Sequence, residues 1–387
     1  MSRRVAQKHP SGLTFLTPAM GVLICAIVLS VVGAIVLLSA SLPLDEGAPY
    51  RFIEKQASWI VITFVVGLFV LKVNLEWARK FIWFGYALCL VGLSLVLVDG
   101  IGKEINGSKS WIRFGDIGFQ VAEFAKLGLV FALAHYFSLI RKDTKSFWKG
   151  FVAPCILIGL VVGLILLQTD LGTALIISLA CLCILFLAGA RIWYLFPSAF
   201  LGIVGAIGLV RFDTERWSRL TAFLDMEGQK AGDAYQIWQA IIAFGAGGVT
   251  GVGLGNGRQQ LRFLPEAHND FIFAVVGEEL GLVATLVIVI VFSILFIAGF
   301  MHLRYAPNTY QYLLAAGCLL TISIQAIVNL GVVTGLLPTT GLPLPFISYG
   351  GSNFLVMGIC VAILINTSLA WGRPMLKDSK RKLRELN

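Results

Sequence analysis

Ten long runs of apolar side chains constrain the fold of this 387-residue chain. A bilayer core of roughly 30 Å is crossed by about 20 residues of helix, and backbone groups in lipid must be hydrogen-bonded internally. We therefore predict an all-α polytopic membrane protein with ten transmembrane helices, at residues 19–40, 57–73, 81–98, 121–140, 151–167, 171–188, 192–210, 273–297, 310–333 and 354–370. The fifth and sixth runs are separated only by residues 168–170, which predicts a tight hairpin.

The composition supports this fold class and fixes the expected topology. Hydrophobic residues make up 58% of the chain and charged residues 13%, which excludes a soluble enzyme, a disordered chain and a nucleic-acid-binding module. Lys and Arg gather in the segments that face the cytoplasm when the N-terminus is inside, so the net charge of +9 is mainly a topology signal. We expect one membrane domain with cytoplasmic termini, an N-terminal tail (1–18), a large extracytoplasmic loop (211–270) and a basic tail (372–387).

Three external stretches, at residues 99–120, 211–270 and 334–353, carry most of the remaining polar residues. Residues 234–246 of the second are apolar at helical spacing and could lie in the interface or re-enter the bundle. The glycine-rich run at 245–257 lacks the preceding strand and the Lys-Ser/Thr pair of a nucleotide loop, so we interpret it as a flexible hinge. The third contains prolines but no charge, which predicts a packed re-entrant loop whose Ser348, Tyr349 and Ser352 could offer hydroxyls to a cavity.

Ionisable residues inside apolar runs are candidates for a functional site, because burying charge in a membrane is costly. Glu123 and Lys126 stand at positions i and i+3, with Gln120 on the same helical face. They could form an ion pair that holds helices together, or a cavity wall that binds an anion or a sugar. Asp170 directly precedes the sixth run and could simply cap that helix through its carboxylate.

Residues 263–281 hold the densest cluster of ionisable side chains. Glu266, His268 and Asp270 lie where the long loop enters the eighth helix, and Glu278 and Glu279 follow two turns later. Asp270 could cap the helix or act chemically. We predict no protein metal site, because the chain has only four His residues and none of its seven Cys residues has the neighbours that would complete a set of ligands.

Five motifs in register resemble the SEDS family, whose FtsW, RodA and SpoVE types are polytopic peptidoglycan glycosyltransferases. The motifs occupy residues 106–127, 168–174, 232–248, 264–281 and 335–353. The resemblance covers the chain from the first helix onward and agrees with ten helices and cytoplasmic termini. The sequence PEAHNDFIFAVVGEELG leans toward the division type, whereas Ser110, Asn269, Thr340 and Asn353 depart from the usual residues.

The resemblance implies that lipid II is both donor and acceptor and that undecaprenyl pyrophosphate is released. The proposed catalytic aspartate of the family maps onto Asp270, which would take the proton of the attacking sugar hydroxyl. Asp170 would be a second functional acid, and Trp111 could stack on a sugar. Lys109, Arg113 and Lys126 could neutralise pyrophosphate, and Glu123 would hold Lys126 or contact sugar. The remaining candidate substrate-binding residues are Gln120, Glu266, His268 and Ser348.

The same resemblance implies the location and the partners. The protein is expected in the bacterial cytoplasmic (inner) membrane with its active site on the extracytoplasmic side. A class B penicillin-binding protein and other divisome or elongasome membrane proteins are expected partners, and nucleic acid is not. Nothing in the sequence specifies a cofactor, although a divalent cation (Mg²⁺ or Mn²⁺) could bridge pyrophosphate and acids. A lipid II flippase and a pure scaffold for a division complex are the alternatives.

Overall fold

The computed structural model describes residues 17–41, 50–105, 107–115, 117–259 and 263–385, with side chains described as far as residue 370 except at 114, 117 and 215. Within this part of the chain, ten helices are long and apolar enough to cross a membrane, which confirms the predicted number. Their bounds are α1 Pro18–Ser41, α2 Arg51–Lys72, α3 to α4 Leu75–Leu97, α5 Val121–Leu139, α6 with its preceding π turn Trp148–Leu167, α7 Leu171–Ala188, α8 Ile192–Phe212, α11 Ile272–Leu303, α12 Thr309–Val333 and the Gly351–Ala370 part of α13.

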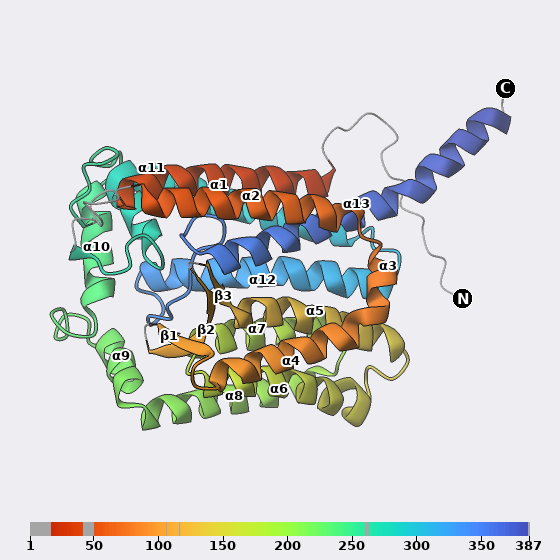
Figure 1. Cartoon of the computed structure of the whole chain (residues 1–387), viewed down its shortest axis with the longest axis horizontal. Coiled ribbons are helices and arrows are strands. Elements are labelled where there is room, and N and C mark those ends of the chain that lie inside the picture. The colour runs from red at the N-terminus through yellow and green to blue at the C-terminus, as the bar shows by residue number, and fades with distance from the viewer. Residues whose placement is uncertain (1–16, 42–49, 106, 116, 260–262, 386–387) are drawn as a thin grey trace.

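The helices form a bundle around α12, with α1 and α2 along one side and α6 and α8 along the other (Figure 1). Burial agrees with this arrangement. In the most apolar part of each helix, 78% of the residues of α12 are buried, against 6% of those of α8. A helix that is apolar all round and buried belongs to a core, whereas an exposed one faces lipid. Helix α8 is therefore a peripheral helix.

Several predicted helix ends are shifted, including the start of the Leu75–Leu97 span and the end of α11, which each extend six residues beyond the prediction. Helix α2 begins at Arg51, six residues before the predicted start, so Arg51 and Lys55 belong to its first turns rather than to a loop. Helix α13 (Gly351–Glu385) continues past the predicted span into the basic segment 372–387, whose side chains lie outside the described ones. The predicted tail 1–18 falls almost wholly on residues outside the described part of the chain.

A small three-stranded sheet, which the sequence did not predict, interrupts the otherwise helical fold. Strands β1 (Gly102–Ile105), β2 (Ser108–Phe114) and β3 (Ile117–Gln120) pair antiparallel in the order β1–β2–β3. Pairing between these short strands supplies hydrogen bonds to the backbone N–H and C=O groups of this polar stretch, which is not helical. The sheet leads directly into α5, so it positions the polar start of that helix.

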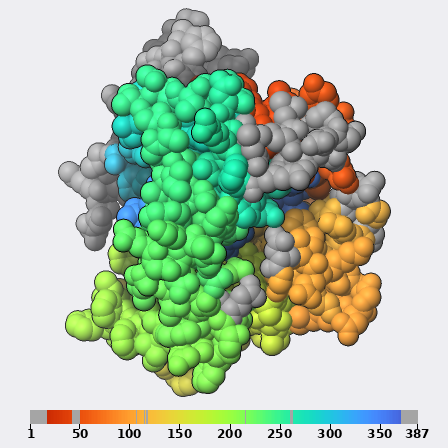
Figure 2. All heavy atoms as spheres, turned by 90° about the vertical axis from the view of Figure 1, so that its left-hand side faces the viewer, coloured from red at the N-terminus to blue at the C-terminus, as the bar shows by residue number. Residues whose placement is uncertain are grey.

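The long loop between α8 and α11 is partly helical. It contains α9 (Thr214–Leu224) and α10 (Tyr235–Gly247), which lie with the sheet at the end of the bundle opposite the C-terminus (Figure 1). Figure 2 looks onto this end and shows α9 and α10, in green and teal, crossing the middle of the face. Ala240 and Ala243 of α10 are fully buried, so α10 packs on the end of the bundle.

The glycine-rich segment after α10 is bound to α11 and is not the free hinge that the sequence suggested. Helix α11 is interrupted at Gly281, whose φ of 74° and ψ of −171° are not helical. The segment fills this break, because Leu282 N donates to Gly248 O at 2.9 Å and Val252 N donates to Glu278 O at 3.0 Å. Non-helical backbone at membrane depth is tolerated when other protein groups satisfy it in this way.

The re-entrant segment predicted at residues 334–353 is packed only from residue 342 to residue 350, because Leu336 and Leu337 nearer its start are 75% and 38% exposed. Leu344, Phe346 and Ile347 are 4% exposed or less. The segment lies so close to α1 that a Cβ added at Gly33 would stand 2.6 Å from Ile347 Cα. The helices therefore enclose this proline-rich backbone, although it is not helical.

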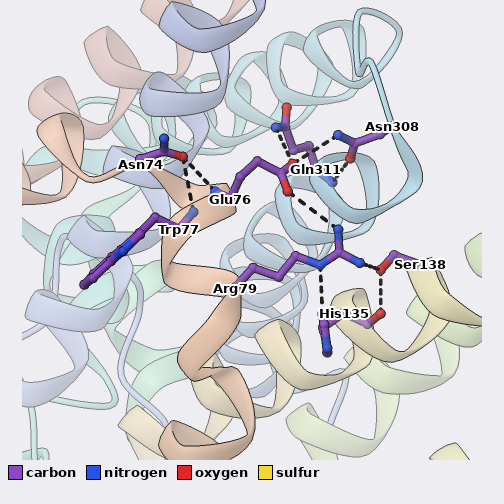
Figure 3. A network of polar contacts seen from close by, with 8 residues as sticks. All are labelled: Asn74, Glu76, Trp77, Arg79, His135, Ser138, Asn308 and Gln311. Atoms are coloured by element: carbon purple, nitrogen blue, oxygen red, sulfur yellow. Dashed lines mark hydrogen bonds and ion pairs between the residues drawn. The ribbon is translucent and has the colours of Figure 1, made fainter.

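A polar network ties three elements together at the other end of the bundle (Figure 3). Arg79 Nε donates to His135 Nδ1 of α5 at 2.9 Å. Glu76 Oε1 accepts from Asn308 Nδ2 at 3.1 Å and from Gln311 Nε2 at 3.0 Å, beside the start of α12. This network fixes the ends of α5 and α12 that lie far from the three polar stretches.

Candidate functional site

A cavity of about 1910 Å³ lies where the sheet, α9, the turn before α7 and the re-entrant segment meet. Its polar part is lined by residues of all three polar stretches, and it continues between the apolar faces of α6, α7 and α8. Small-molecule pockets usually measure roughly 300–1,000 Å³, so this cavity has room for a large amphiphilic ligand.

The cavity brings together most of the residues that the sequence singled out, but not all of them. Lys109 Nζ forms an ion pair with Asp99 and donates to Leu97 O, and Ser348 Oγ accepts from Leu344 N at 2.8 Å, so neither borders the cavity. Lys126 is buried behind the wall. The candidates that do line the cavity are Trp111, Arg113, Gln120, Glu123, Asp170, Glu266, His268 and Asp270.

Asp270 presents its carboxyl group to the cavity. Its Oδ1 atom is buried without a hydrogen-bond partner among the described residues, although the residue as a whole is half-buried because it borders the cavity. The N-cap of α11 is Phe271 and makes no side-chain capping bond, so the interpretation of Asp270 as a helix cap is wrong. Burial, with a smaller effect of the nearby Glu266 charge, raises the pKa of Asp270 to about 7.

The backbone around Asp270 is held by α12. Asn329 Nδ2 donates to Asp270 O at 2.8 Å and to Leu342 O at 2.7 Å. One buried amide of α12 therefore joins the segment before α11 to the re-entrant segment. Because both carbonyls share this donor, Asp270 and the re-entrant segment keep a fixed separation.

His268 lies beside Asp270 within an aromatic cluster. Its ring centroid is 4.8 Å from that of Phe52 and 6.0 Å from that of Tyr349. Burial lowers the pKa of His268, and the Glu266 carboxylate opposes this shift without reversing it. The imidazole is thus predominantly neutral at pH 7, and it offers hydrogen bonding rather than a positive charge.

Asp170 caps α7, as one interpretation of the sequence predicted, and also faces the cavity. Its Oδ1 accepts from Thr173 N at 3.0 Å and its Oδ2 accepts from Gln120 Nε2 at 3.1 Å. The preceding Thr169 has a φ of 62°, an uncommon left-handed conformation, and its Oγ1 donates to Gly107 O at 2.6 Å. The tight hairpin between α6 and α7 is therefore confirmed and is tied to the sheet.

The start of α7 lies against the re-entrant segment next to Asp270. A Cβ added at Gly172 would stand 2.4 Å from Thr340 O, and a Cβ added at Gly341 would stand 3.6 Å from Asp270 Oδ2. Residues 340–341 thus form a bridge between the α7 start and the Asp270 carboxyl group. Because Gly172 lies directly against the backbone of Thr340, any side chain at position 172 must displace this bridge.

We expect Gly172→Ala to reduce activity strongly while leaving the bundle folded, because the added methyl group must displace the 340–341 bridge, which lies against the Asp270 carboxyl group. The matched control is Gly163→Ala in α6, where a Cβ meets nothing within 4 Å and helix propensity favours Ala. Product formation and thermal unfolding in detergent should be measured for both variants. Equal activity in the two variants would contradict the expected displacement.

Glu123 and Lys126 form a buried ion pair with an N–O distance of 2.8 Å, and their side chains are 1% and 2% exposed. Glu123 Oε2 also accepts from Asn353 Nδ2 at 3.1 Å, and Lys126 Nζ donates to Gln325 Oε1 at 2.9 Å. Gln325 Nε2 in turn donates to Pro343 O at 2.9 Å. The pair therefore connects α5 to α12, α13 and the re-entrant segment, which matches the first of the two predicted roles.

Several cavity residues were missed at the sequence level. Arg216 and Arg219 of α9 line the cavity, as do Lys55 of α2 and Asn329 of α12. The spacing of two arginines at i and i+3 in TERWSRL was the available signal, because it places both on one helical face. No group of three or more His, Cys, Asp or Glu side chains suited to a metal ion occurs among the described residues.

Comparison with known proteins identifies the relatives of this chain. The family model for FtsW, RodA and SpoVE, described as cell cycle proteins, matches residues 20–370. The chain belongs to the FtsW/RodA/SpoVE family. This confirms the resemblance seen in the motifs.

Relatives within the family are similar over nearly their whole length. A probable peptidoglycan glycosyltransferase FtsW from Coxiella burnetii is 37% identical over 89% of this chain and 94% of its own. The stage V sporulation protein E of Bacillus subtilis is 36% identical over 91% of this chain and 97% of its own.

Solved structures of the family share the fold. One chain comes from a structure entitled "Structural coordination of polymerization and crosslinking by a peptidoglycan synthase complex", with 25% identity, a TM-score of 0.73, and coverage of 90% of this chain and 97% of that chain. Thermus thermophilus RodA has 27% identity, a TM-score of 0.64, and coverage of 89% of this chain and 95% of that chain. The polytopic helical architecture is thus that of the family.

Proposed function

We propose that this chain polymerises the glycan strands of peptidoglycan from lipid II, in cell division or cell-shape maintenance. The names of its relatives support a peptidoglycan glycosyltransferase. The observation that carries the mechanism is the Asp270 carboxyl group, which borders a cavity with a polar end and an apolar extension. Such a cavity suits a sugar headgroup joined to a polyprenyl chain.

Asp270 acts as the general base of the proposed reaction. The C4 hydroxyl of the GlcNAc of one lipid II attacks the anomeric carbon of the MurNAc of the other, and its proton passes to the Asp270 carboxylate. The new β-1,4 C–O bond forms as the bond to pyrophosphate breaks, and undecaprenyl pyrophosphate leaves with the bonding electrons. Developing positive charge at the sugar carbon and negative charge on the leaving group both require compensation within the cavity.

The pH profile follows from the raised pKa of Asp270. A general base works in its ionised form, so we expect kcat/KM to rise as the pH increases through about 7 and to level off above that value. The measurement is the initial rate of polymer formation from labelled lipid II at limiting substrate across the pH range 5 to 9. A rate that falls as the pH rises through this region would exclude Asp270 as the base.

We place the protein in the bacterial cytoplasmic membrane with the cavity on the extracytoplasmic side and both termini in the cytoplasm. The distribution of Lys and Arg supports this orientation.

A class B penicillin-binding protein is the proposed partner, since the related structure is that of a peptidoglycan synthase complex. A divalent cation, Mg²⁺ or Mn²⁺, stays a prediction. The described residues hold no group of three or more His, Cys, Asp or Glu side chains for it, so pyrophosphate oxygens would supply most of its ligands.

Purified protein incubated with labelled lipid II, with and without the partner, tests the function directly. Gel separation of the products should show glycan polymer. A flippase would instead relocate labelled lipid II between the leaflets of liposomes and make no polymer. A pure scaffold would tolerate simultaneous substitution of Asp270, Glu123 and Lys126.

A further inference from the structure

We propose that Arg216 and Arg219 of α9 bind the pyrophosphate of the lipid-linked donor and position it for departure, an inference that rests on the polymerase function proposed above. The pyrophosphate of lipid II has two phosphoryl groups, each with one negative charge. Two adjacent guanidinium groups match that charge and can each form paired hydrogen bonds with phosphate oxygens.

Helix α9 directs both arginines into the cavity. Asp213 caps its start, since Asp213 Oδ1 accepts from Arg216 N at 3.2 Å. Asp213 Oδ2 pairs with Arg216 Nε at 3.2 Å and so holds the side chain in place. Arg219 follows one turn later and lines the same cavity. The two guanidinium groups therefore belong to one face of one capped helix.

Arg216 keeps donors for a ligand. Its Nη2 donates to Thr169 O in the turn before α7, and its Nε faces Asp213. These contacts use two of the five N–H groups that a guanidinium offers. The remaining donors belong to a side chain that is 24% exposed and borders the cavity. An anion entering the cavity can therefore bind without breaking the contacts that orient Arg216.

The position of Arg216 relative to Asp270 suits a leaving group. Arg216 contacts Thr169, and Gly172, three residues further on, packs under Thr340. Gly341 then borders the Asp270 carboxyl group. The arginines and the proposed base are thus separate groups on the wall of one cavity, and the 340–341 bridge connects them. In a displacement at the sugar carbon, the base and the departing anion must act at different places around the reacting atom.

The other candidate cations are less suited to this role. Lys109 is paired with Asp99 and Lys126 with Glu123, and neither lines the cavity. His268 has a lowered pKa and is predominantly neutral at pH 7. Lys55 and Arg113 do line the cavity, but they come from different elements, α2 and β2. Only α9 places two cavity-lining cations on the same described element.

The test is lipid binding by Arg216→Gln, Arg219→Gln and the double variant of the full-length protein. The probes are undecaprenyl pyrophosphate, undecaprenyl monophosphate and inorganic pyrophosphate. We expect each substitution to weaken binding of the pyrophosphate lipid by about tenfold, the effect of losing a charge-assisted hydrogen bond. Binding of the monophosphate lipid should weaken by about threefold or less. Inorganic pyrophosphate should compete with the pyrophosphate lipid on the wild type and lose potency in the double variant.

The matched control is Arg211→Gln, because Arg211 lies at the same junction but stacks over the Trp217 ring, at 4.6 Å, and does not line the cavity. Its affinity for all three probes should stay within twofold of the wild type. If Arg216→Gln does not fold, the same binding measurements are made on Arg216→Lys and Arg219→Gln. The Arg216→Lys variant should retain part of the affinity for the pyrophosphate lipid.

Two results would overturn the proposal. One is unchanged affinity for the pyrophosphate lipid in the double variant, and the other is an equal loss for both lipids, which would indicate general charge attraction. Kinetics give a second readout, since the variants should raise KM or lower kcat while keeping the pH midpoint of the wild type. Binding is measured without turnover, so a wild type that binds lipid but makes no polymer would refute the polymerase function separately.

Discussion

Asp270→Asn should lower the rate of glycan polymerisation by about 10² to 10⁴, the usual contribution of a positioned general base. Asparagine has nearly the same shape but cannot take the proton of the attacking hydroxyl. The fold should not suffer, because Asp270 Oδ1 has no described hydrogen-bond partner to lose and the charged carboxylate is costly to bury. We therefore expect an unchanged or higher unfolding temperature together with the loss of activity.

The matched control is Asp233→Asn, which makes the same chemical change in the same long loop at an exposed position outside the cavity. Both variants should be assayed for polymer formation and for thermal unfolding in one detergent. Near-wild-type polymerisation by Asp270→Asn would remove the proposed mechanism. Inactivity accompanied by unfolding would assign a structural role to Asp270 instead.

Lys126→Met should destabilise the protein by about 3–5 kcal/mol, because it leaves Glu123 charged and buried without its partner. Glu123→Gln in the same chain should recover much of this loss, since the double variant buries no net charge. The free energies of the two single variants and the double variant form a cycle that isolates the coupling. Denaturant or thermal unfolding in detergent provides the measurement.

An exposed ion pair on the same bundle gives the comparison. Lys149 and Asp143 lie 2.7 Å apart, but their side chains are 62% and 48% exposed. Lys149→Met should therefore cost less than about 1 kcal/mol. Equal costs for Lys126→Met and Lys149→Met would show that burial does not set the strength of the Glu123–Lys126 interaction.

The sequence predicted the membrane helices well because each apolar run must satisfy its own backbone in lipid. It predicted the sheet poorly, since β1 to β3 are short strands whose pairing depends on turns and on contacts with the α6–α7 hairpin, such as Lys109 N with Gln168 O. Periodicity carries little information for strands of four residues. The start of α2 was missed for a related reason, because Arg51 and Lys55 interrupt the apolar pattern without interrupting the helix.

The sequence identified site residues whose type is rare beside apolar runs. It misjudged residues whose role depends on the direction in which the side chain points. Asp270, Asp170 and Glu123 stand out as acids beside apolar runs, and all three line the cavity. Lys109 and Lys126 have the right charge, but their side chains turn to Asp99 and Glu123, a choice that only tertiary packing determines. The arginines of α9 looked like ordinary loop residues, because the helix that aligns them is polar and short.

The spacing of Glu123 and Lys126 also bears on how the protein is made. Their other partners, Gln325 and Asn353, lie some two hundred residues further along the chain and do not exist when α5 leaves the ribosome. A lone charge within a helix that enters the bilayer is costly to insert. Because the acid and the base neighbour each other on one helix, α5 can enter the bilayer as an electrically neutral segment, and the later helices assemble around a pair that is already neutralised.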